Sequence, residues 1–465
     1  MIIQEIPYQN PLVLFSSFSN QVGAIFFDSA QPSGEYGRYS FIAIDPFSKL
    51  VSKNGCITLN GATLEGDPFS VLGEELLKYT SASYPDLPPF QGGAAGFFSY
   101  DLCHHVENIP AAKMDDMQFP DMVIGFYDLV MGFDHVNGRA WILSQGYPEL
   151  NSRVREVRAK KRIDWLLRQL AETKLGLPFS DVKCKEDAIT SYFNGETYTA
   201  AVRKVRDYIL AGDIFEANIS QRFQVELPHA LTPFDLYQRL RLCNPAPFSA
   251  YVNAGDTIIA SASPERFLKL TQGHVESRPI KGTRPRGKTP IQDQQLANEL
   301  LASEKDNAEN IMIVDLLRND LSRVCQDHSV KVPQLCSLES YATVHHLVSV
   351  VTGQLQPQYT AIDLLRATFP GGSITGAPKI RAMEIIAEIE PTRRGPYCGS
   401  IGYIGFNGDM DCSITIRTFC IKNNRVTFQA GGAVVADSDP VAEYEETLTK
   451  SSALRKVLLH DFADR

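Results

Sequence analysis

Apolar runs of strand length alternate with short polar turns through the first 145 residues of the chain. The runs 22–27 and 39–44 flank a polar turn and predict two strands. The run 90–98 is rich in glycine and alanine, so we expect a strand that packs close against other backbone. Residues 122–133 and 139–144 flank a second polar turn and predict a hairpin. This part of the chain is therefore expected to be rich in strands.

A change of periodicity marks the end of this part. Apolar residues over 151–171 recur at helical spacing and predict an amphipathic helix. The polar stretch 173–190 that follows is the best candidate for a linker. We therefore expect a strand-rich region over 1–145, a connecting helix and linker over 146–190, and a third region over 191–458.

Long helical patterns and strand-like runs alternate in the third region. We expect helices at 196–210, 304–324, 380–389 and 441–462. We expect strands at 214–225, 257–262, 267–270, 340–351, 397–405, 412–419 and 426–435. This alternation predicts one large α+β core.

Composition and charge narrow the function classes. Hydrophobic residues make up 44% and charged residues 21% of 465 residues, as in soluble globular proteins. The net charge of -9 argues against a nucleic-acid partner, so any bound anion is expected to be small. No apolar run approaches the roughly 18 residues of a membrane span, and the N-terminus lacks a basic region before an apolar run, so we expect a cytoplasmic protein. Nine cysteines without a C-x-x-C pair indicate neither a disulfide framework nor a thiolate metal site.

One lysine stands in an unusual setting. The stretch 276–287 reads ESRPIKGTRPRG and places Lys281 among Arg278, Arg284 and Arg286. If the lysine lies in a desolvated turn, these cations would lower its pKa and favour the neutral, nucleophilic amine. The alternative is a solvated basic hairpin.

Two carboxylates of the third region are placed to reach a ligand. Glu265 follows a proline turn between two strands, from which it projects into a cleft or pairs with Arg266. Glu309 lies among the apolar positions of a helix, where a partly buried carboxylate needs a cation or a metal as its partner.

The C-terminal elements add charged and small residues. Glu443, Glu446 and Lys450 share one helix face, which is either an exposed charge stripe or a site for a divalent cation beside an anionic substrate. The pair Gly431-Gly432 inside a strand indicates that a ligand or another backbone comes close.

A histidine pair and a glycine-rich loop complete the candidates. His345 and His346 adjoin on a strand, so at most one faces a given cleft. The loop 370–379 offers backbone N–H groups and Thr375 as a possible helix cap. It matches neither a Walker A motif nor G-x-G-x-x-G, so a nucleotide site is not favoured.

Several motifs together closely resemble the chorismate-utilising enzymes, a family that includes anthranilate synthase component I, aminodeoxychorismate synthase component I, and isochorismate and salicylate synthases. They are SASPERF (261–267), RPIKGTRPRG (278–287), AENIMIVDLLRNDLSRV (308–324), HHLVSVVTG (345–353), PGGSITGAPKIRAME (370–384), GYIGFNG (402–408), SITIRT (413–418), QAGGAVVADSDP (429–440) and EYEETLTK (443–450). The resemblance implies a sandwich of two orthogonally packed antiparallel sheets with outer helices, in which the regions share one intertwined core.

The resemblance also implies site residues. Catalytic roles fall to Lys281 as the nucleophile that adds to the ring of chorismate, Glu265 as general acid and base, and His346 beside the ring. Ligands for Mg2+ are implied at Glu309 and Glu446, with Glu443 nearby. Substrate contacts are implied at Gly282, Thr283, Thr375, Tyr397, Arg417, Gly431, Gly432, Ala433 and Lys450.

The residue before Gly282-Thr283 separates members of the family. Anthranilate synthases usually carry alanine there, whereas Lys281 resembles the enzymes that aminate chorismate for 4-aminobenzoate and folate synthesis, a reaction of the transaminase class. Relatives commonly have glutamine at the position of Glu216, and isochorismate synthases have a lysine. An anthranilate synthase component I and a silent partner that only regulates an amidotransferase remain as alternatives.

Two partners follow from the resemblance. No cysteine lies in a nucleophile elbow followed by a paired histidine and glutamate, so ammonia is expected from a separate glutamine amidotransferase subunit or from solution. Five residues match the region that holds tryptophan in some relatives, which leaves tryptophan binding open: Ser29, Tyr39, Pro247, Phe248 and Ser249.

Overall fold

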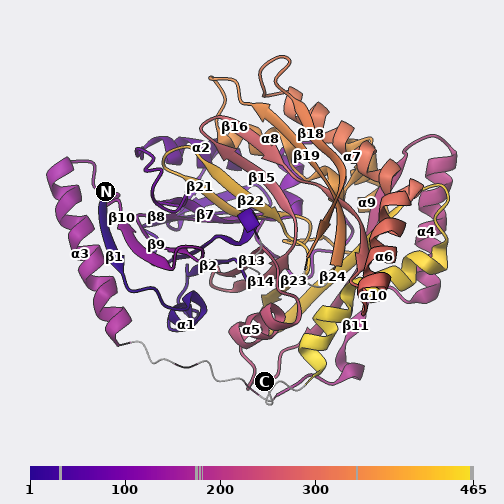
Figure 1. The fold of residues 1–465 in the computed structure, drawn as a ribbon, viewed down its shortest axis with the longest axis horizontal. Coiled ribbons are helices and arrows are strands. Elements are labelled where there is room, and N and C mark those ends of the chain that lie inside the picture. The colour runs from indigo at the N-terminus through magenta and orange to yellow at the C-terminus, as the bar shows by residue number, and fades with distance from the viewer. Residues whose placement is uncertain (31–33, 173–175, 177–179, 181, 342–343, 461–465) are drawn as a thin grey trace.

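Two large antiparallel sheets with helices on their outer faces form the protein (Figure 1), as the resemblance implies. The computed structural model describes residues 1–30, 34–172, 176, 180, 182–341 and 344–460. Of the predicted linker, residues 173–175, 177–179 and 181 lie outside the described part.

The first sheet runs, in spatial order, through β1 (Ile2–Ile6), β10 (Arg139–Ser144), β9 (Leu129–Asp134), β3 (Tyr39–Ala43), β2 (Ile25–Asp28), β13 (Phe248–Asn253), β14 (Thr257–Ser263), β23 (Thr418–Lys422), β24 (Arg425–Val434), β12 (Glu216–Glu226) and β11 (Thr190–Ser191), with β20 (Gly376–Ala377) beside β12.

The second sheet runs through β17 (Ile280–Pro285), β19 (Val344–Gln354), β16 (His274–Ser277), β15 (Arg266–Thr271), β22 (Met410–Ile414), β21 (Ser400–Gly405), β7 (Gly93–Phe98), β8 (Met122–Tyr127), β4 (Ser48–Lys53), β5 (Cys56–Leu59) and β6 (Ala62–Leu64), with β18 (Lys331–Ser340) beside β19.

The helices are α1 (Pro11–Ser16), α2 (Pro68–Leu77), α3 (Ser152–Ala171), α4 (Gly195–Leu210), α5 (Pro233–Cys243), α6 (Pro290–Ala302), α7 (Glu304–Ser322), α8 (Ala361–Thr368), α9 (Lys379–Ile389) and α10 (Pro440–Leu459). Four short 3-10 turns lie at Gly34–Gly37, Tyr100–His105, Glu186–Ala188 and Gly372–Ile374. In the described residues no helix is long and apolar enough to cross a bilayer.

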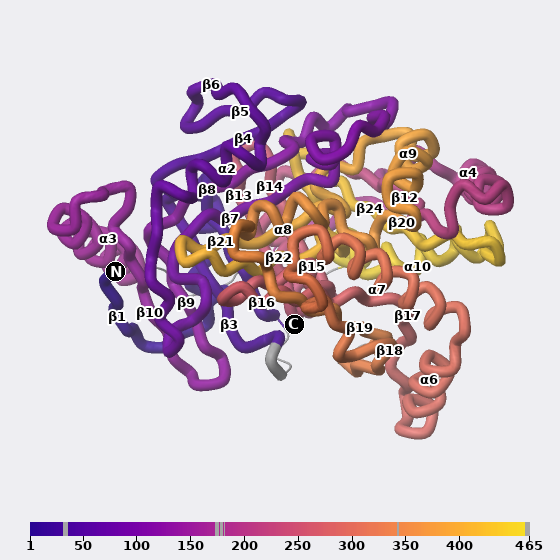
Figure 2. Tube along the Cα trace, turned by 90° about the horizontal axis from the view of Figure 1, so that it is seen from above, coloured from indigo at the N-terminus to yellow at the C-terminus, as the bar shows by residue number. Residues whose placement is uncertain are grey.

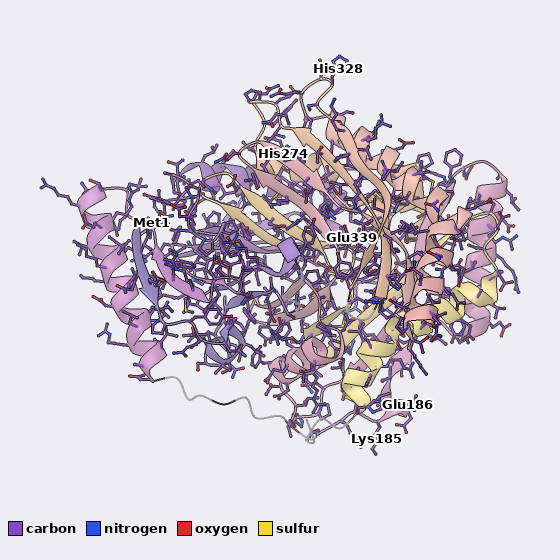
Figure 3. All side chains as sticks on the ribbon, viewed as in Figure 1. Met1, Lys185, Glu186, His274, His328 and Glu339 are labelled. Carbon is purple, nitrogen blue, oxygen red and sulfur yellow. The ribbon has the colours of Figure 1, made fainter. Side chains whose placement is uncertain are left out.

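Side chains fill the space between and around the sheets (Figure 3). The core between the sheets is aromatic and aliphatic, with Phe90 stacked on Tyr403 at 4.4 Å between ring centroids. One outer core joins the second sheet to α2, α7 and α8, and another joins the first sheet to α3, α5 and α10. Strands buried on both faces read as continuous apolar runs, which is why β7, β8 and β21 show little polar alternation.

Each sheet is built from both sides of the predicted linker, because a block of strands from before it pairs edge to edge with a block from after it. In the first sheet β2 pairs with β13, and in the second β7 pairs with β21. The close approach predicted for β7 is confirmed, because a Cβ at Gly93 would lie 2.2 Å from the carbonyl oxygen of Ile404. Along the long axis, α3 and β1 lie at one end and α4 and α6 at the other (Figure 2).

Two runs predicted as single strands instead cross from one sheet to the other. Residues 122–133 divide into β8 and β9, and residues 412–419 divide into β22 and β23. At the second crossing Arg417 has a φ of 54°, in the left-handed region. The sequence pattern does not reveal such a crossing, because the strands on both sides of it are largely buried.

Helix ends follow the local chemistry of their caps. Ser303 accepts from the N–H of Asp306 at the start of α7, and Asp439 accepts from the N–H groups of Val441 and Ala442 at the start of α10. Thr375 does not cap α9, contrary to expectation, because the helix begins after Pro378 and the Thr375 hydroxyl donates to the Gly371 oxygen instead.

Candidate active site

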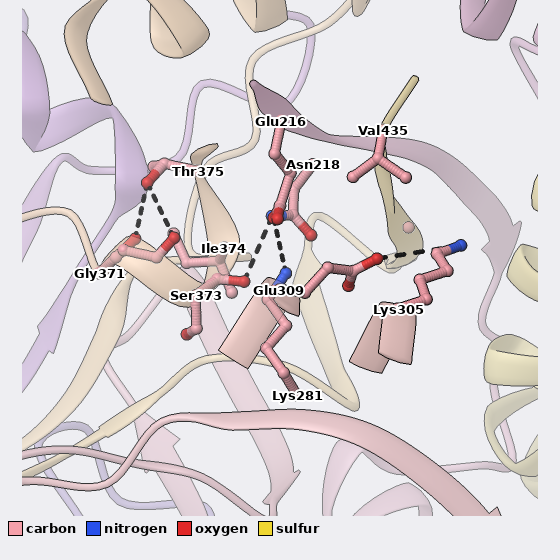
Figure 4. Close-up of polar contacts among 12 residues, drawn as sticks. Glu216, Asn218, Lys281, Lys305, Glu309, Gly371, Ser373, Ile374, Thr375 and Val435 are labelled. Atoms are coloured by element: carbon pink, nitrogen blue, oxygen red, sulfur yellow. Dashed lines mark hydrogen bonds and ion pairs between the residues drawn. The ribbon is translucent and has the colours of Figure 1, made fainter. Parts of the chain in front are cut away.

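Lys281 lies on β17 in the interior of the protein rather than in a turn. The pairing of β17 with β19 shifts between Ile280 and Thr283, and Gly282 adopts a φ of +84°, which glycine tolerates best. The Lys281 side chain contacts Glu216 on β12, with 2.7 Å between Lys281 Nζ and Glu216 Oε1 (Figure 4). Both residues are less than one-tenth exposed.

The three neighbouring arginines do not act on this amine as expected. Arg278 pairs with Glu339, Arg284 with Glu299 and Asp306, and Arg286 with Asp293. Burial lowers the pKa of Lys281, but the carboxylates of Glu216 and Glu309 outweigh it, and the pKa of Lys281 is raised. The prediction of a lowered pKa is therefore wrong, because sequence neighbours on a strand point away from one another.

Glu265 lies where the chain crosses from β14 to β15. It does not pair with Arg266, which instead binds Asp411 and Glu276. The Ser373 hydroxyl donates to Glu265 Oε1 at 2.6 Å. Burial raises the pKa of Glu265 to about 7, so this carboxyl can both donate and accept a proton near neutral pH.

A group of carboxylates lines the adjoining wall. Glu309 comes from α7, and Glu443 and Glu446 come from α10. Lys305 Nζ lies 3.5 Å from Glu443 Oε1 and 3.9 Å from Glu309 Oε1. Burial raises the pKa of Glu309 to about 7 and also raises that of Glu443. Lys450 Nζ contacts Glu446 Oε1 at 2.5 Å, and this cation overcomes the effect of burial, so the pKa of Glu446 is lowered.

The histidine pair divides as the strand geometry predicts. His345 bonds to Ser340 and Asp293, whereas His346 Nδ1 lies 2.9 Å from the hydroxyl of Thr283. Burial and the charge of Arg417 lower the pKa of His346 to about 4, so the ring is neutral at physiological pH. It can therefore offer one donor or acceptor without adding charge.

The remaining predicted substrate contacts meet at the end of β24. Arg417 donates to the backbone oxygen of Lys450, and Lys450 Nζ donates to the oxygen of Gly431 at 3.0 Å. Residues Gly431, Gly432 and Ala433 pair with β12 two to four residues after Glu216. Tyr397 is buried. Electrostatic interactions link Arg417 to Tyr397 and Glu446, so these charges belong to one region.

Comparison with known proteins identifies the family of this chain. Residues 23–456 match the family described as chorismate binding enzyme. The chain belongs to the chorismate-binding enzyme family. An aminodeoxychorismate synthase component 1 from Salmonella typhimurium is 42% identical over 442 residues, covering 94% of this chain and 93% of that protein. An anthranilate synthase component 1 from Acetivibrio thermocellus is 39% identical over 460 residues, covering 97% of this chain and 93% of that protein.

A solved chorismate-binding enzyme has the same fold. The crystal structure of anthranilate synthase component I from Streptococcus pneumoniae superimposes with a TM-score of 0.81 at 35% identity, covering 91% of this chain and 93% of that one. The predicted family and fold are thus confirmed. Relatives with two different names are about equally similar, so similarity alone does not choose the reaction within the chorismate-binding family.

The carboxylates of this chorismate-binding enzyme suit a hard divalent cation. Glu309 Oε1 and Glu443 Oε2 are buried without a hydrogen-bond partner, and a Cβ at Gly432 would lie 2.9 Å from Glu443 Oε2 and 3.2 Å from Glu446 Oε1. Oxygen donors of this kind fit Mg2+. Within the described residues no three such side chains converge closely enough to enclose an ion as they stand. Glu309 and Glu443 also face the ammonium of Lys305, a cation that would compete with a metal for them.

A separate cavity of about 430 Å3 gathers the five residues predicted for tryptophan. Ser29, Tyr39, Pro247, Phe248 and Ser249 all line it. Arg266 also lines the cavity, directly after Glu265 in the chain. The two sites thus lie on either side of one crossing between the sheets.

Sequence reasoning assigned no role to three residues of this region. Ser373 holds Glu265, Lys305 stands between two carboxylates, and Glu216 pairs with Lys281. Lys305 lies four residues before Glu309 on the same helix, a spacing that signals their proximity. The other two contacts join distant segments, and no local pattern announces them.

Proposed function

We propose that this chain is the chorismate-aminating component of an aminodeoxychorismate synthase. It replaces the 4-hydroxyl of chorismate with ammonia to give 4-amino-4-deoxychorismate, a precursor of 4-aminobenzoate and folate. The observation that carries the proposal is the buried amine of Lys281, which shares its surroundings with Glu265, a carboxyl that exchanges a proton near pH 7. An anthranilate synthase component I remains the alternative, because relatives of that name are equally similar.

Recognition of chorismate rests on charge. The substrate is a dianion, and Arg417 and Lys450 supply cations near the end of β24. Arginine offers a bidentate fork to a carboxylate. Mg2+ held by Glu309, Glu443 and Glu446 would neutralise the second carboxylate of the substrate. Neutral His346 and the Thr283 hydroxyl would then contact the ring without adding charge.

The chemistry proceeds in two displacements. The Lys281 amine forms a bond to C2 of the ring, the ring double bond shifts, and the C4 hydroxyl leaves as water with a proton from Glu265. Ammonia then forms a bond to C4, the double bond shifts back, and the C2–N bond to Lys281 breaks. Glu265 accepts a proton from the new ammonium group, so the two displacements exchange water for ammonia.

Ammonia is proposed to come from a glutamine amidotransferase subunit. The name "component 1" of the relatives supports a protein of more than one component. Adding such a subunit is expected to confer glutamine-dependent turnover, whereas ammonium salts alone should support it at high concentration. Absence of both association and glutamine-dependent turnover would contradict this partner.

Product analysis tests the reaction. With chorismate, Mg2+ and ammonium, we expect 4-amino-4-deoxychorismate without pyruvate; fluorescent anthranilate with pyruvate would support the alternative. Intact-mass spectrometry tests the nucleophile. The wild type is expected to accumulate a substrate adduct that is absent from Lys281→Ala, and full activity of that variant would refute the covalent step.

We also infer that the 430 Å3 cavity binds tryptophan, as the resemblance implies. Its wall combines aromatic rings with the charges of Arg266 and Asp411, which suits an amphipathic amino acid. Calorimetry with tryptophan should detect binding that Ser249→Trp abolishes. An identical null titration for both proteins would refute it.

A further inference from the structure

The partner of Lys281 is a carboxylate that the fold isolates from water. Glu216 is fully buried on β12, and its Oε1 accepts from Lys281 Nζ at 2.7 Å and from Asn218 Nδ2 at 3.1 Å (Figure 4). Its Oε2 is buried and has no hydrogen-bond partner. One carboxylate oxygen is thus held against the amine, while the other remains unsatisfied.

This arrangement is a poor way to stabilise a fold. A buried ion pair must overcome the cost of removing both charges from water, and an unpaired buried oxygen adds to that cost. A glutamine at position 216 would accept the same hydrogen bond without a charge. A negative charge at this position therefore calls for a role toward the lysine.

We propose that Glu216 holds the proton of Lys281 in the free enzyme and accepts that proton when the amine attacks the substrate. The proposal deepens the proposed function, because it rests on Lys281 being the nucleophile. Other carboxylates also interact with the lysine: Glu309 from α7, Glu265 from the crossing before β15 and Glu446 from α10. Among the contacts of the described residues, however, Glu216 alone lies within ion-pair distance of Nζ.

The proton route is balanced. The ammonium of Lys281 gives one proton to Glu216 Oε1, and the resulting neutral amine uses its lone pair to form the bond to C2. When ammonia has entered at C4 and the C2–N bond breaks, the amine leaves with that electron pair and recovers the proton from Glu216. Glu265 handles only the protons of the departing hydroxyl and the incoming ammonia, so the two carboxyl groups have separate tasks.

Chemical labelling of the free enzyme tests the first half of the proposal. Cyanate modifies neutral amines, and peptide mapping follows Lys281 as a function of pH. In Glu216→Gln, which keeps shape and loses charge, labelling of Lys281 near pH 7.5 is expected to be at least about tenfold faster, with its pH midpoint lowered by one unit or more. Lys53, which lies on β4 and pairs with Asp115, provides the internal reference. An unchanged midpoint would overturn the proposal.

Turnover with ammonium tests the second half. The wild type is expected to turn over at pH values where cyanate does not label Lys281, because the proton passes to Glu216 and not to solvent. In Glu216→Gln, the pH dependence of kcat/KM should follow the labelling curve of Lys281. If wild-type turnover instead rises together with labelling, Glu216 is not the acceptor.

A second variant and one comparison keep the outcomes distinct. Glu216→Asp retains the charge and should keep the wild-type labelling midpoint, even where turnover falls through altered geometry; a midpoint like that of Glu216→Gln would refute the role of the charge. Full activity of Lys281→Ala would refute the proposed nucleophile. The difference in labelling between wild type and Glu216→Gln would then still measure the effect of Glu216 on the protonation of Lys281.

Discussion

At the scale of single residues, burial assigns a different protonation state to each group of the site. It raises the pKa of Glu265 to about 7 and lowers the pKa of His346 to about 4, so one is a ready proton donor and the other a neutral ring. Lys281 is equally buried but faces carboxylates, which keep it charged. Burial therefore favours the neutral forms of Glu265 and His346, whereas at Lys281 the neighbouring carboxylates outweigh burial and favour the charged form.

The raised pKa of Glu265 predicts a pH-dependent cost in stability. The folded protein binds this proton more tightly than the unfolded chain, so the free energy of unfolding falls as pH rises from 4.5 through about 7. Glu265→Gln removes the cost and is expected to be more stable than wild type at about pH 8, by up to roughly 3 kcal/mol. Urea unfolding at about pH 8 and about pH 4.5 measures the difference, which should vanish at the lower pH.

A paired buried carboxylate provides the control. Glu390 accepts from Arg394 at 2.7 Å and from the backbone N–H of Ser220. Glu390→Gln leaves a buried guanidinium without its counter-charge and is expected to lose roughly 3 kcal/mol or more of stability. If Glu265→Gln behaves in the same way, the protonation argument for Glu265 is wrong.

At the scale of elements, one glycine of β24 makes room for the carboxylates of α10. A Cβ at Gly432 would meet Glu443 Oε2 at 2.9 Å and Glu446 Oε1 at 3.2 Å, the flexible ends of two side chains. Gly432→Ala is therefore expected to fold normally and to weaken Mg2+ binding about tenfold or more, as measured by calorimetry. At Gly431 a Cβ would lie 2.3 Å from the Ile219 oxygen, so Gly431→Ala should destabilise the strand itself. Equal loss of thermal stability in both variants would contradict this division.

Helix α7 carries a cation that competes for the same carboxylates. Lys305 contacts both Glu443 and Glu309 and is half exposed. Lys305→Met should therefore increase Mg2+ affinity by roughly three- to tenfold, a modest gain because solvent screens the pair. Lys204→Met, which removes an exposed pair with Glu388, should leave the affinity unchanged. A decrease in affinity for Lys305→Met would show that the lysine orders the carboxylates instead.

Several long elements follow from the sequence, whereas their partners do not. Periodicity and caps predict α3, α4, α7 and α10 nearly to their ends. The crossings at Asp128 and Arg417 are hidden, because the flanking strands are largely buried and the short connections between them do not distinguish a crossing from one continuous strand. Lys281 can be singled out from its own sequence neighbours. Its pairing with Glu216, 65 residues away, cannot be predicted from them. Local patterns encode elements, and the contacts of the site depend on sheet order.

At the scale of the whole molecule, that sheet order makes each part of the chain supply neighbours to strands of the other part. Removing everything after α3 would deprive β2 of β13 and β7 of β21, so both sheets would gain unpaired edges at their centres. Removing everything before α4 would likewise make β13 an edge strand of the first sheet, because its partner β2 would be missing. Neither part keeps a complete core between the sheets, because that core draws on β3, β7, β14 and β21 alike.

We therefore predict that the fragments 1–172 and 182–465 do not fold separately. Each should give a poorly dispersed NMR spectrum when expressed alone, whereas co-expression should restore a complex, since β2 pairs with β13 and β7 pairs with β21 across the two fragments. The intact chain should unfold in one transition by calorimetry and by denaturant. A cooperatively folded fragment 1–172 would show instead that the N-terminal strands form an independent domain.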